Sequence, residues 1–274
     1  MRAARRRAHA GETGERDGGR YVFARDELAT AAKVMAEEAV AVVVDDFLSR
    51  ELCDACTNMC IEGLGPLLVS LGQREHGRDD LIFVFGSGEP AAGGDDAPPS
   101  IRTPRGVMKH EKLRPLVATS AALKSLHGPL SEAMGIEVGV PQLAQLARYT
   151  AGSIGYAWHK DNTIDDSSEG VMDGPRGQRI CDRLVTAILY LTDSFDSAEA
   201  NSLSDRPSST GRVGCVGGSL SVVDPSGGER KLEPRPGRLV IFNSRSVLHQ
   251  VERVVEGDRW ALSLWFTYPE SMWL

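Results

Sequence analysis

The sequence predicts a mainly β protein with α-helices, in which the helices pack on an antiparallel double-sheet core. From residue 141 onward, short runs of β-branched or alternating apolar residues are separated by clusters of Gly, Asp, Ser and Pro. Many short strands with polar turns are typical of a sandwich or barrel rather than of a parallel sheet. Before residue 141, longer segments carry apolar residues at helical spacing, so the helices are expected there.

The first helix is expected over 27–39, "ELATAAKVMAEEA", with Asp26 as its N-cap. The β-branched run in "VAVVVDDFLS" then predicts a buried strand. Ser49, at the end of that run, is suited to cap a second helix, "ELCDACTNMC".

Three of the five cysteines, Cys53, Cys56 and Cys60, share one face of that second helix. A structural zinc site would need four ligands, and no second CxxC or nearby His completes the set. Buried free thiols are the favoured interpretation, because free Cys is among the most often buried residue types.

The middle of the chain predicts a strand, a loop and a helix. The strand is expected in "DDLIFVFGSG", and the helix over 110–135 with a break near Gly128 and Pro129. Between them, 89–104 is predicted to be a mobile loop. The reason is that Gly, Pro and Asp at that density disfavour both a strand ladder and a core.

The C-terminal half carries the other predicted strands. We place strands or strand pairs in "QLAQLARYT", "YAWHKDN", "RLVTAILYLT", "GGSLSVVD", "KLEPRPGRLVIFNS", "HQVERVV" and "RWALSLWFTY". Two connections between them are long, 163–182 and 193–216.

One domain is predicted over 27–274, with helical support over 27–140 and a β core over 141–270. The Arg-rich segment 1–26 is predicted to be a disordered basic tail, because it has no hydrophobic stretch and acidic residues interrupt its Arg run. Since neither a secretory signal nor a C-terminal retention signal is visible, a cytoplasmic or nuclear location is expected.

Charge and hydropathy argue against two classes of partner. The net charge is −7, without the clustered Lys and Arg of a nucleic-acid-binding surface. No apolar run approaches the roughly 20 residues of a membrane span. Neither nucleic acid nor membrane is therefore expected as a partner.

The stretch "GYAWHKDN" places His159 and Asp161 two positions apart. In a strand, side chains at i and i+2 point to the same face, so these two would project together. His249 follows the strand "GRLVIFNS" and a short turn, where a side chain can point into the mouth of a barrel. Two histidines and a carboxylate with open positions form the facial triad of non-haem iron(II) oxygenases. Alone, the HxD pair is more often a surface salt link, so its companions decide between these interpretations.

Arg259 is the companion that favours a binding site. The opposite face of its predicted strand is apolar, being formed by Trp260, Leu262, Leu264 and Phe266. An arginine in such surroundings is expected to be partly buried and paired with an anion. Its partner could be an internal Asp or a ligand carboxylate, which a guanidinium binds bidentately. Tyr149 and Tyr190 add hydroxyl donors on neighbouring strands, and Thr186 shares a face with Tyr190.

Several segments in this order resemble the 2-oxoglutarate- and iron(II)-dependent prolyl 4-hydroxylases, in particular the soluble oxygen-sensing type that modifies hypoxia-inducible factor. They are "VAVVVDDFLS", "RYTAGSIGYAWHKDN", "RLVTAILYLT", "GGSLSVVDP", "GRLVIFNSRSVLHQV" and "RWALSLWF". The resemblance spans about residues 30–268. It implies a double-stranded β-helix, or jelly roll, buttressed by N-terminal helices, in agreement with the strand pattern.

The resemblance also implies roles for individual residues. His159, Asp161 and His249 would be the iron ligands. Arg259 and Tyr190 would bind the distal carboxylate of 2-oxoglutarate.

Further roles concern the walls of the site. Tyr149 and Thr186 would line the cosubstrate pocket. Tyr156 and Trp265 match aromatic positions where the target proline approaches the metal, and Arg183 matches a basic residue at the entrance.

The function implied is hydroxylation at the 4-position of a prolyl residue in a protein substrate. It uses Fe(2+), 2-oxoglutarate and O2, with ascorbate as a candidate reductant, and releases succinate and CO2. The proline would lie in a flexible segment of the partner, and an oxygen-sensing role is one candidate. The alternatives are a 2-oxoglutarate oxygenase acting on another residue or a small molecule, a binding module without turnover, and a zinc or nickel protein. The long connections and the unmatched segment 75–105 leave the substrate open.

Overall fold

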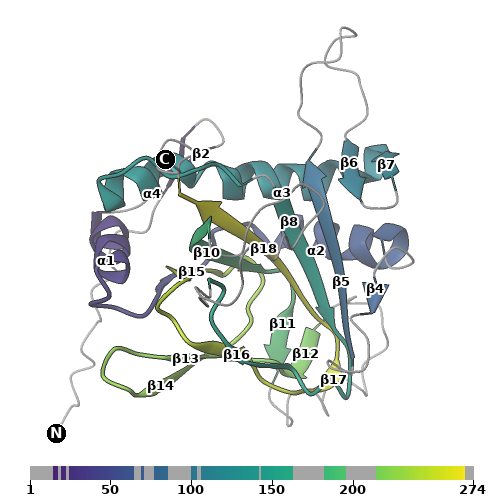
Figure 1. Ribbon diagram of the computed structural model, residues 1–274. Coiled ribbons are helices and arrows are strands. Elements are labelled where there is room, and N and C mark those ends of the chain that lie inside the picture. The colour runs from purple at the N-terminus through teal and green to yellow at the C-terminus, as the bar shows by residue number, and fades with distance from the viewer. Residues whose placement is uncertain are drawn as a thin grey trace, which may run out of the picture.

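Figure 1 shows the computed structural model of the chain. The structure describes residues 15–17, 20–22, 25–64, 69–70, 77–85, 100–103, 106–141, 143–162, 182–195 and 214–268. None of the described helices is long and apolar enough to cross a membrane.

A nine-stranded sheet forms the larger layer of the fold. Its strands, in spatial order, are β3 (Val42–Val44), β15 (Leu239–Asn243), β10 (Arg183–Tyr190), β18 (Arg259–Thr267), β8 (Leu143–Tyr149), β5 (Arg78–Phe85), β6 (Ser100–Thr103) and β7 (Gly106–Lys109), with β4 (Val69–Ser70) beside β5. All of these neighbours pair antiparallel. Segments far apart in the sequence therefore lie side by side.

Smaller sheets complete the β structure. A four-stranded sheet has the order β14 (Glu229–Leu232), β13 (Leu220–Val223), β16 (His249–Val251) and β9 (Tyr156–His159). A three-stranded sheet contains β11 (Asp193–Phe195), β12 (Gly214–Gly217) and β17 (Val254–Gly257). Near the N-terminus, β1 (Glu15–Asp17) and β2 (Arg20–Val22) form a two-stranded sheet.

The helices gather on the side of the large sheet away from β13, β14 and β16 (Figure 1). They are α1 (Arg25–Met35), α2 (Arg50–Met59) with the π turn Cys60–Leu64, the 3-10 turn Glu111–Leu113, α3 (Arg114–Lys124) and α4 (His127–Met134). One apolar core lies between these helices and the large sheet, and a second lies between the large and four-stranded sheets. This arrangement confirms the mainly β fold with helical support.

The N-terminal elements differ in extent from the prediction. The helix expected over 27–39 ends at Met35, because the chain turns through Glu37 in the left-handed region at φ 62°. The following strand is shortened to Val42–Val44, the residues that pair with β15. The start of α1 at Arg25 and the pairing of β1 with β2 place ordered structure inside the predicted tail 1–26.

The capping and thiol predictions for α2 are confirmed. Ser49 is the N-cap, and its hydroxyl accepts a hydrogen bond of 3.3 Å from the Leu52 amide. Cys53, Cys56 and Cys60 are free, buried thiols in the helix-side core. Burial raises the pKa of Cys53 to about 12, as expected of an unreactive structural thiol.

The expected loop 89–104 is partly a strand. Residues 100–103 form β6, which pairs with both β5 and β7, with Ile101 and Thr103 buried and Arg102 exposed. The alternation of "SIRT" suffices for a strand once both neighbours offer backbone partners. Residues 89–99 lie outside the described residues.

Two further expectations are refined. The break in the helix 110–135 falls at 125–126, and Pro129 lies in the first turn of α4, where a missing N–H is tolerated. The connection 193–216 begins with β11 and ends within β12, which pair in parallel. Residues 196–213 and 163–181 lie outside the described residues.

Candidate metal centre and anion pocket

Pairing between β9 and β16 brings the two candidate histidines together. His159 lies directly opposite His249 in the antiparallel register, and their ring centroids are 4.2 Å apart. Gly155, just before β9, permits this close approach: its φ is +85°, and a Cβ there would meet the Val251 carbonyl oxygen at 2.0 Å. Only glycine adopts this conformation against the neighbouring backbone without strain.

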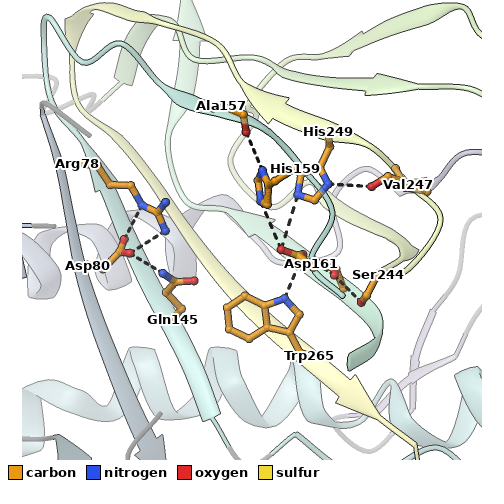
Figure 2. A network of polar contacts seen from close by, with 11 residues as sticks. Arg78, Asp80, Gln145, Ala157, His159, Asp161, Ser244, Val247, His249 and Trp265 are labelled. Carbon is orange, nitrogen blue, oxygen red and sulfur yellow. Dashed lines mark hydrogen bonds and ion pairs between the residues drawn. The ribbon is translucent and has the colours of Figure 1, made fainter. Parts of the chain in front are cut away.

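Asp161 joins the histidines from a bend rather than from a strand. We expected all of "YAWHKDN" to be strand, but β9 ends at His159. The carboxylate nevertheless faces both rings: Asp161 Oδ1 lies 3.5 Å from His159 Nε2 and 3.8 Å from His249 Nε2. The three candidate ligand atoms lie within 4.8 Å of one another, and Figure 2 shows them converging.

Backbone carbonyls orient both imidazole rings. His159 Nδ1 lies 2.8 Å from the Ala157 carbonyl and His249 Nδ1 lies 3.1 Å from that of Val247. Since a carbonyl can only accept, each Nδ1 donates its proton and each Nε2 keeps a lone pair directed at Asp161. Burial also lowers the pKa of His249, which favours its neutral, ligating form.

The second carboxylate oxygen of Asp161 is held by two donors. Thr186 Oγ1 donates to Oδ2 at 2.6 Å and Trp265 Nε1 donates at 3.1 Å. Because Thr186 spends its single proton on Asp161, the Ser244 hydroxyl must be the donor in its 2.8 Å contact with Thr186. Burial alone would raise the pKa of Asp161, but its hydrogen bonds and the neighbouring imidazoles lower it, so the carboxylate is ionised.

This donor set fits a divalent iron ion. Two neutral imidazole nitrogens and one carboxylate oxygen are available on one side, as in a facial triad with open positions. Hydrogen bonds fix the far atoms of all three side chains, as is usual around bound metals. Within the described residues, no other group of His, Cys, Asp and Glu has this spacing.

Arg259 lies in the same interior without a carboxylate partner. Its side chain is 2% exposed, and its Nε donates to the Gly218 carbonyl at 2.8 Å. Its guanidinium carbon lies 5.1 Å from the Tyr149 ring and 5.0 Å from the Tyr190 ring. In the part of the chain that the structure describes, it forms no ion pair, so the alternative of an internal Asp partner finds no support. A buried cation of this kind is suited to an anionic ligand.

Gly218 makes room for this arginine. Its φ is +73°, and a Cβ at this position would lie 2.8 Å from Arg259 Cδ. The absence of a side chain lets the Gly218 carbonyl approach Nε and fixes the guanidinium beside the two tyrosine rings.

Tyr190 presents a second unmet group next to Arg259. It is fully buried, and its hydroxyl has no hydrogen-bond partner among the described residues. Burial raises the pKa of Tyr190, so the hydroxyl keeps its proton as a donor. A buried donor beside a buried cation can bind one carboxylate jointly.

The remaining predicted site residues lie around the metal cluster. The Tyr156 ring meets the His159 ring edge-on at 4.3 Å, and Arg183 lies 3.9 Å over the ring of Trp265. Trp265 is buried and bonded to Asp161. Thr186, expected to line the cosubstrate pocket, instead contacts Asp161, so we now propose that it supports a metal ligand.

Sequence reasoning missed a second polar cluster, which Figure 2 also shows. Arg78 and Asp80 form a bidentate pair near the start of β5, and Gln145 of β8 donates to Asp80. Two charged residues at i and i+2 of an otherwise apolar strand were a possible signal, but their partners lie more than 60 residues away and no local pattern connects them.

Comparison with known proteins agrees with this geometry. Residues 144–267 match the profile of the 2OG-Fe(II) oxygenase superfamily. This segment contains every candidate site residue named from the sequence. No curated protein sequence matches the chain.

Solved structures show the same fold at low identity. A prolyl-4-hydroxylase from Pseudomonas putida has a TM-score of 0.58 at 19% identity, covering 88% of this chain and 99% of that chain. A prolyl hydroxylase from Trichoplax adhaerens, in complex with a hypoxia-inducible-factor oxygen degradation domain peptide fragment, has 0.53 at 17% identity, covering 89% and 91%. The non-heme alpha-ketoglutarate-dependent carbocyclase SnoK from nogalamycin biosynthesis has 0.53 at 15%, covering 87% and 83%. These likenesses confirm the fold.

Proposed function

Residues 144–267 form a domain of the 2OG-Fe(II) oxygenase superfamily, and from this premise we propose that the chain is a prolyl 4-hydroxylase acting on a protein substrate. The superfamily implies Fe(2+), 2-oxoglutarate and O2 as reactants. The observation that carries the proposal is the buried Arg259, a cation without a carboxylate partner in the described interior that also holds the His–Asp–His cluster.

His159, Asp161 and His249 would hold the iron. Bound there, Fe(2+) supplies the oxidation, in which one atom of O2 enters the succinate formed with loss of CO2 and the other becomes the product hydroxyl. The chain contributes the facial geometry, because its hydrogen bonds to Ala157, Val247 and Thr186 leave only one atom of each ligand free.

Arg259 and Tyr190 would fix the cosubstrate at its far end. The guanidinium would bind the distal carboxylate of 2-oxoglutarate through its Nη atoms, since Nε is already engaged by Gly218. The Tyr190 hydroxyl would donate to the same carboxylate, and the Tyr149 ring would form the wall. Because these groups are buried, the electrostatic attraction is stronger than it would be in water.

The substrate proline would approach beside Tyr156 and Trp265, with Arg183 at the entrance. Tyr156 borders His159, while Arg183 stacks on Trp265, so these residues flank the metal cluster. Two of the compared structures are prolyl hydroxylases, which supports proline as the target. SnoK, with the same TM-score as the Trichoplax enzyme, shows why the fold does not choose the substrate.

We further propose a partner that presents its proline in a flexible segment, a cytoplasmic or nuclear location, and ascorbate as the reductant that restores Fe(2+). An oxygen-sensing role is the physiological extension of this proposal. Dependence of turnover on O2 concentration in the physiological range would test that extension.

Incubation of proline-containing peptides with the protein, Fe(2+), 2-oxoglutarate and O2 tests the function. Mass spectrometry should show a gain of one oxygen on proline, matched by succinate formation, and none with the His159→Ala variant. Oxidation of another residue or of a small molecule would replace the substrate while keeping the oxygenase. Absence of 2-oxoglutarate decarboxylation under all conditions would instead indicate a binding module, and activity with zinc or nickel alone would contradict the iron assignment.

A further inference from the structure

A buried ion pair lies on β5 outside the groups that the proposed reaction uses. Arg78 and Asp80 are 7% and 5% exposed, whereas Leu81 and Phe83 of the same strand pack into the helix-side core. Burying an ion pair costs hydration that good geometry only just repays, and apolar residues of similar volume are often more stable. Stability alone therefore gives no reason for charges here.

The pair has a geometry that fixes the guanidinium plane. Arg78 Nε donates to Asp80 Oδ1 at 3.0 Å and Nη2 donates to Oδ2 at 2.7 Å. Gln145 of the adjacent strand adds a donor at 2.5 Å to Oδ2. The carboxylate is thus held from two strands, and a guanidinium bound through two nitrogens cannot rotate about its last bond.

The fixed guanidinium contacts the aromatic wall next to the metal cluster. Its carbon lies 4.3 Å from the centroid of the Tyr156 ring and 5.5 Å from that of Tyr149. The Tyr156 ring in turn meets His159 edge-on at 4.3 Å. A chain of contacts therefore runs from β8 through Asp80, Arg78 and Tyr156 to a candidate iron ligand.

We propose that Arg78, Asp80 and Gln145 form a positioning network that holds Tyr156 beside His159 and so shapes the surface that receives the substrate proline. The inference rests on the proposed function, because Tyr156 meets the substrate there. Arg78 acts through Tyr156, by a cation–π contact whose orientation Asp80 and Gln145 determine.

The test uses Arg78→Lys, which keeps the charge but loses the fork and the flat stacking surface. The KM for a hydroxylated proline peptide should rise about tenfold, whereas the KM for 2-oxoglutarate should change by less than about twofold. Asp80→Asn should have a similar but smaller effect on the peptide KM. The matched control is Arg148→Lys, because Arg148 also forms a forked pair, with Asp258, and lies 5.4 Å over a ring, that of Trp260.

A second readout needs no activity. In metal-free protein labelled with 3-fluorotyrosine, the 19F resonance of Tyr156, assigned with Tyr156→Phe, should shift or broaden in Arg78→Lys and stay unchanged in Arg148→Lys. An unchanged resonance in Arg78→Lys would overturn the network, as would equal rises in both KM values. If wild-type protein hydroxylates no peptide, the proposed function fails, and the resonance still decides whether Arg78 positions Tyr156.

Discussion

Alternate side chains of β18 enter two different environments. One set joins the helix-side core and consists of Trp260, Leu262, Leu264 and Phe266. The other set faces the four-stranded sheet and consists of Arg259, Ala261, Ser263 and Trp265. Burial hardly separates the sets, since Arg259 is 2% and Trp260 1% exposed.

Charge and bonding separate the two faces instead. The helix-side face needs only apolar residues of suitable volume, because its stability comes from close packing. The inner face places Arg259 near two tyrosine rings at one end and Trp265 against Asp161 at the other. Changes on the inner face should therefore alter ligand binding, and changes on the helix side should alter the free energy of unfolding.

The largest effect is expected from His249→Ala on the inner side. Loss of a ligand nitrogen should lower Fe(2+) affinity by more than about 100-fold, beyond the loss typical of outer partners alone. Anaerobic titration monitored by calorimetry would measure it. His127→Ala, on helix α4, is the matched control and should bind metal normally. Wild-type affinity in His249→Ala would remove the metal assignment.

A large effect of the other kind is expected from Leu262→Ala. This fully buried residue of the helix-side core should cost about 2–5 kcal/mol in the free energy of unfolding. Ser263→Ala, its partly exposed neighbour, should change that energy by about 0.5 kcal/mol or less. Denaturant unfolding of both variants measures the difference. Equal costs would show that the two faces are not distinct in the way described.

Arg259→Lys should have a smaller effect, confined to the cosubstrate. A lysine keeps the charge but not the fork, so the KM for 2-oxoglutarate should rise about 10- to 100-fold. Steady-state kinetics at varied 2-oxoglutarate, with Arg148→Lys as the comparison, would measure it. A loss of metal affinity without a change in this KM would contradict the assignment.

The smallest effect is expected from Thr186→Val, which removes the 2.6 Å hydrogen bond to Asp161 while keeping the shape of the side chain. Fe(2+) affinity should fall about tenfold. Thr119→Val is the control on the helix side, since the buried Thr119 hydroxyl has no hydrogen-bond partner among the described residues. That variant should bind metal normally and lose no stability. Matching losses in both variants would refute a role specific to Asp161.

Much of the fold followed from local patterns. The apolar runs around β8, β10, β15 and β18 predicted strands that the structure contains. Element ends were less predictable: α1 stops at Met35, and Ser100–Thr103 forms a strand inside a Gly- and Pro-rich segment. These ends depend on which backbone groups find partners in distant segments, and local composition carries no information on that.

The sequence by itself determined the chemistry of the site: the residue types at 159, 161, 249 and 259, and the alternation that puts Arg259 opposite an apolar face. Only the tertiary structure decided that Asp161 reaches the histidines from a bend, that Thr186 supports it, and that Arg78 lies over Tyr156. The physical reason is the range of the interactions. Periodicity is a property of neighbours in the chain, whereas each of these contacts depends on how strands from separate parts of the chain are packed together.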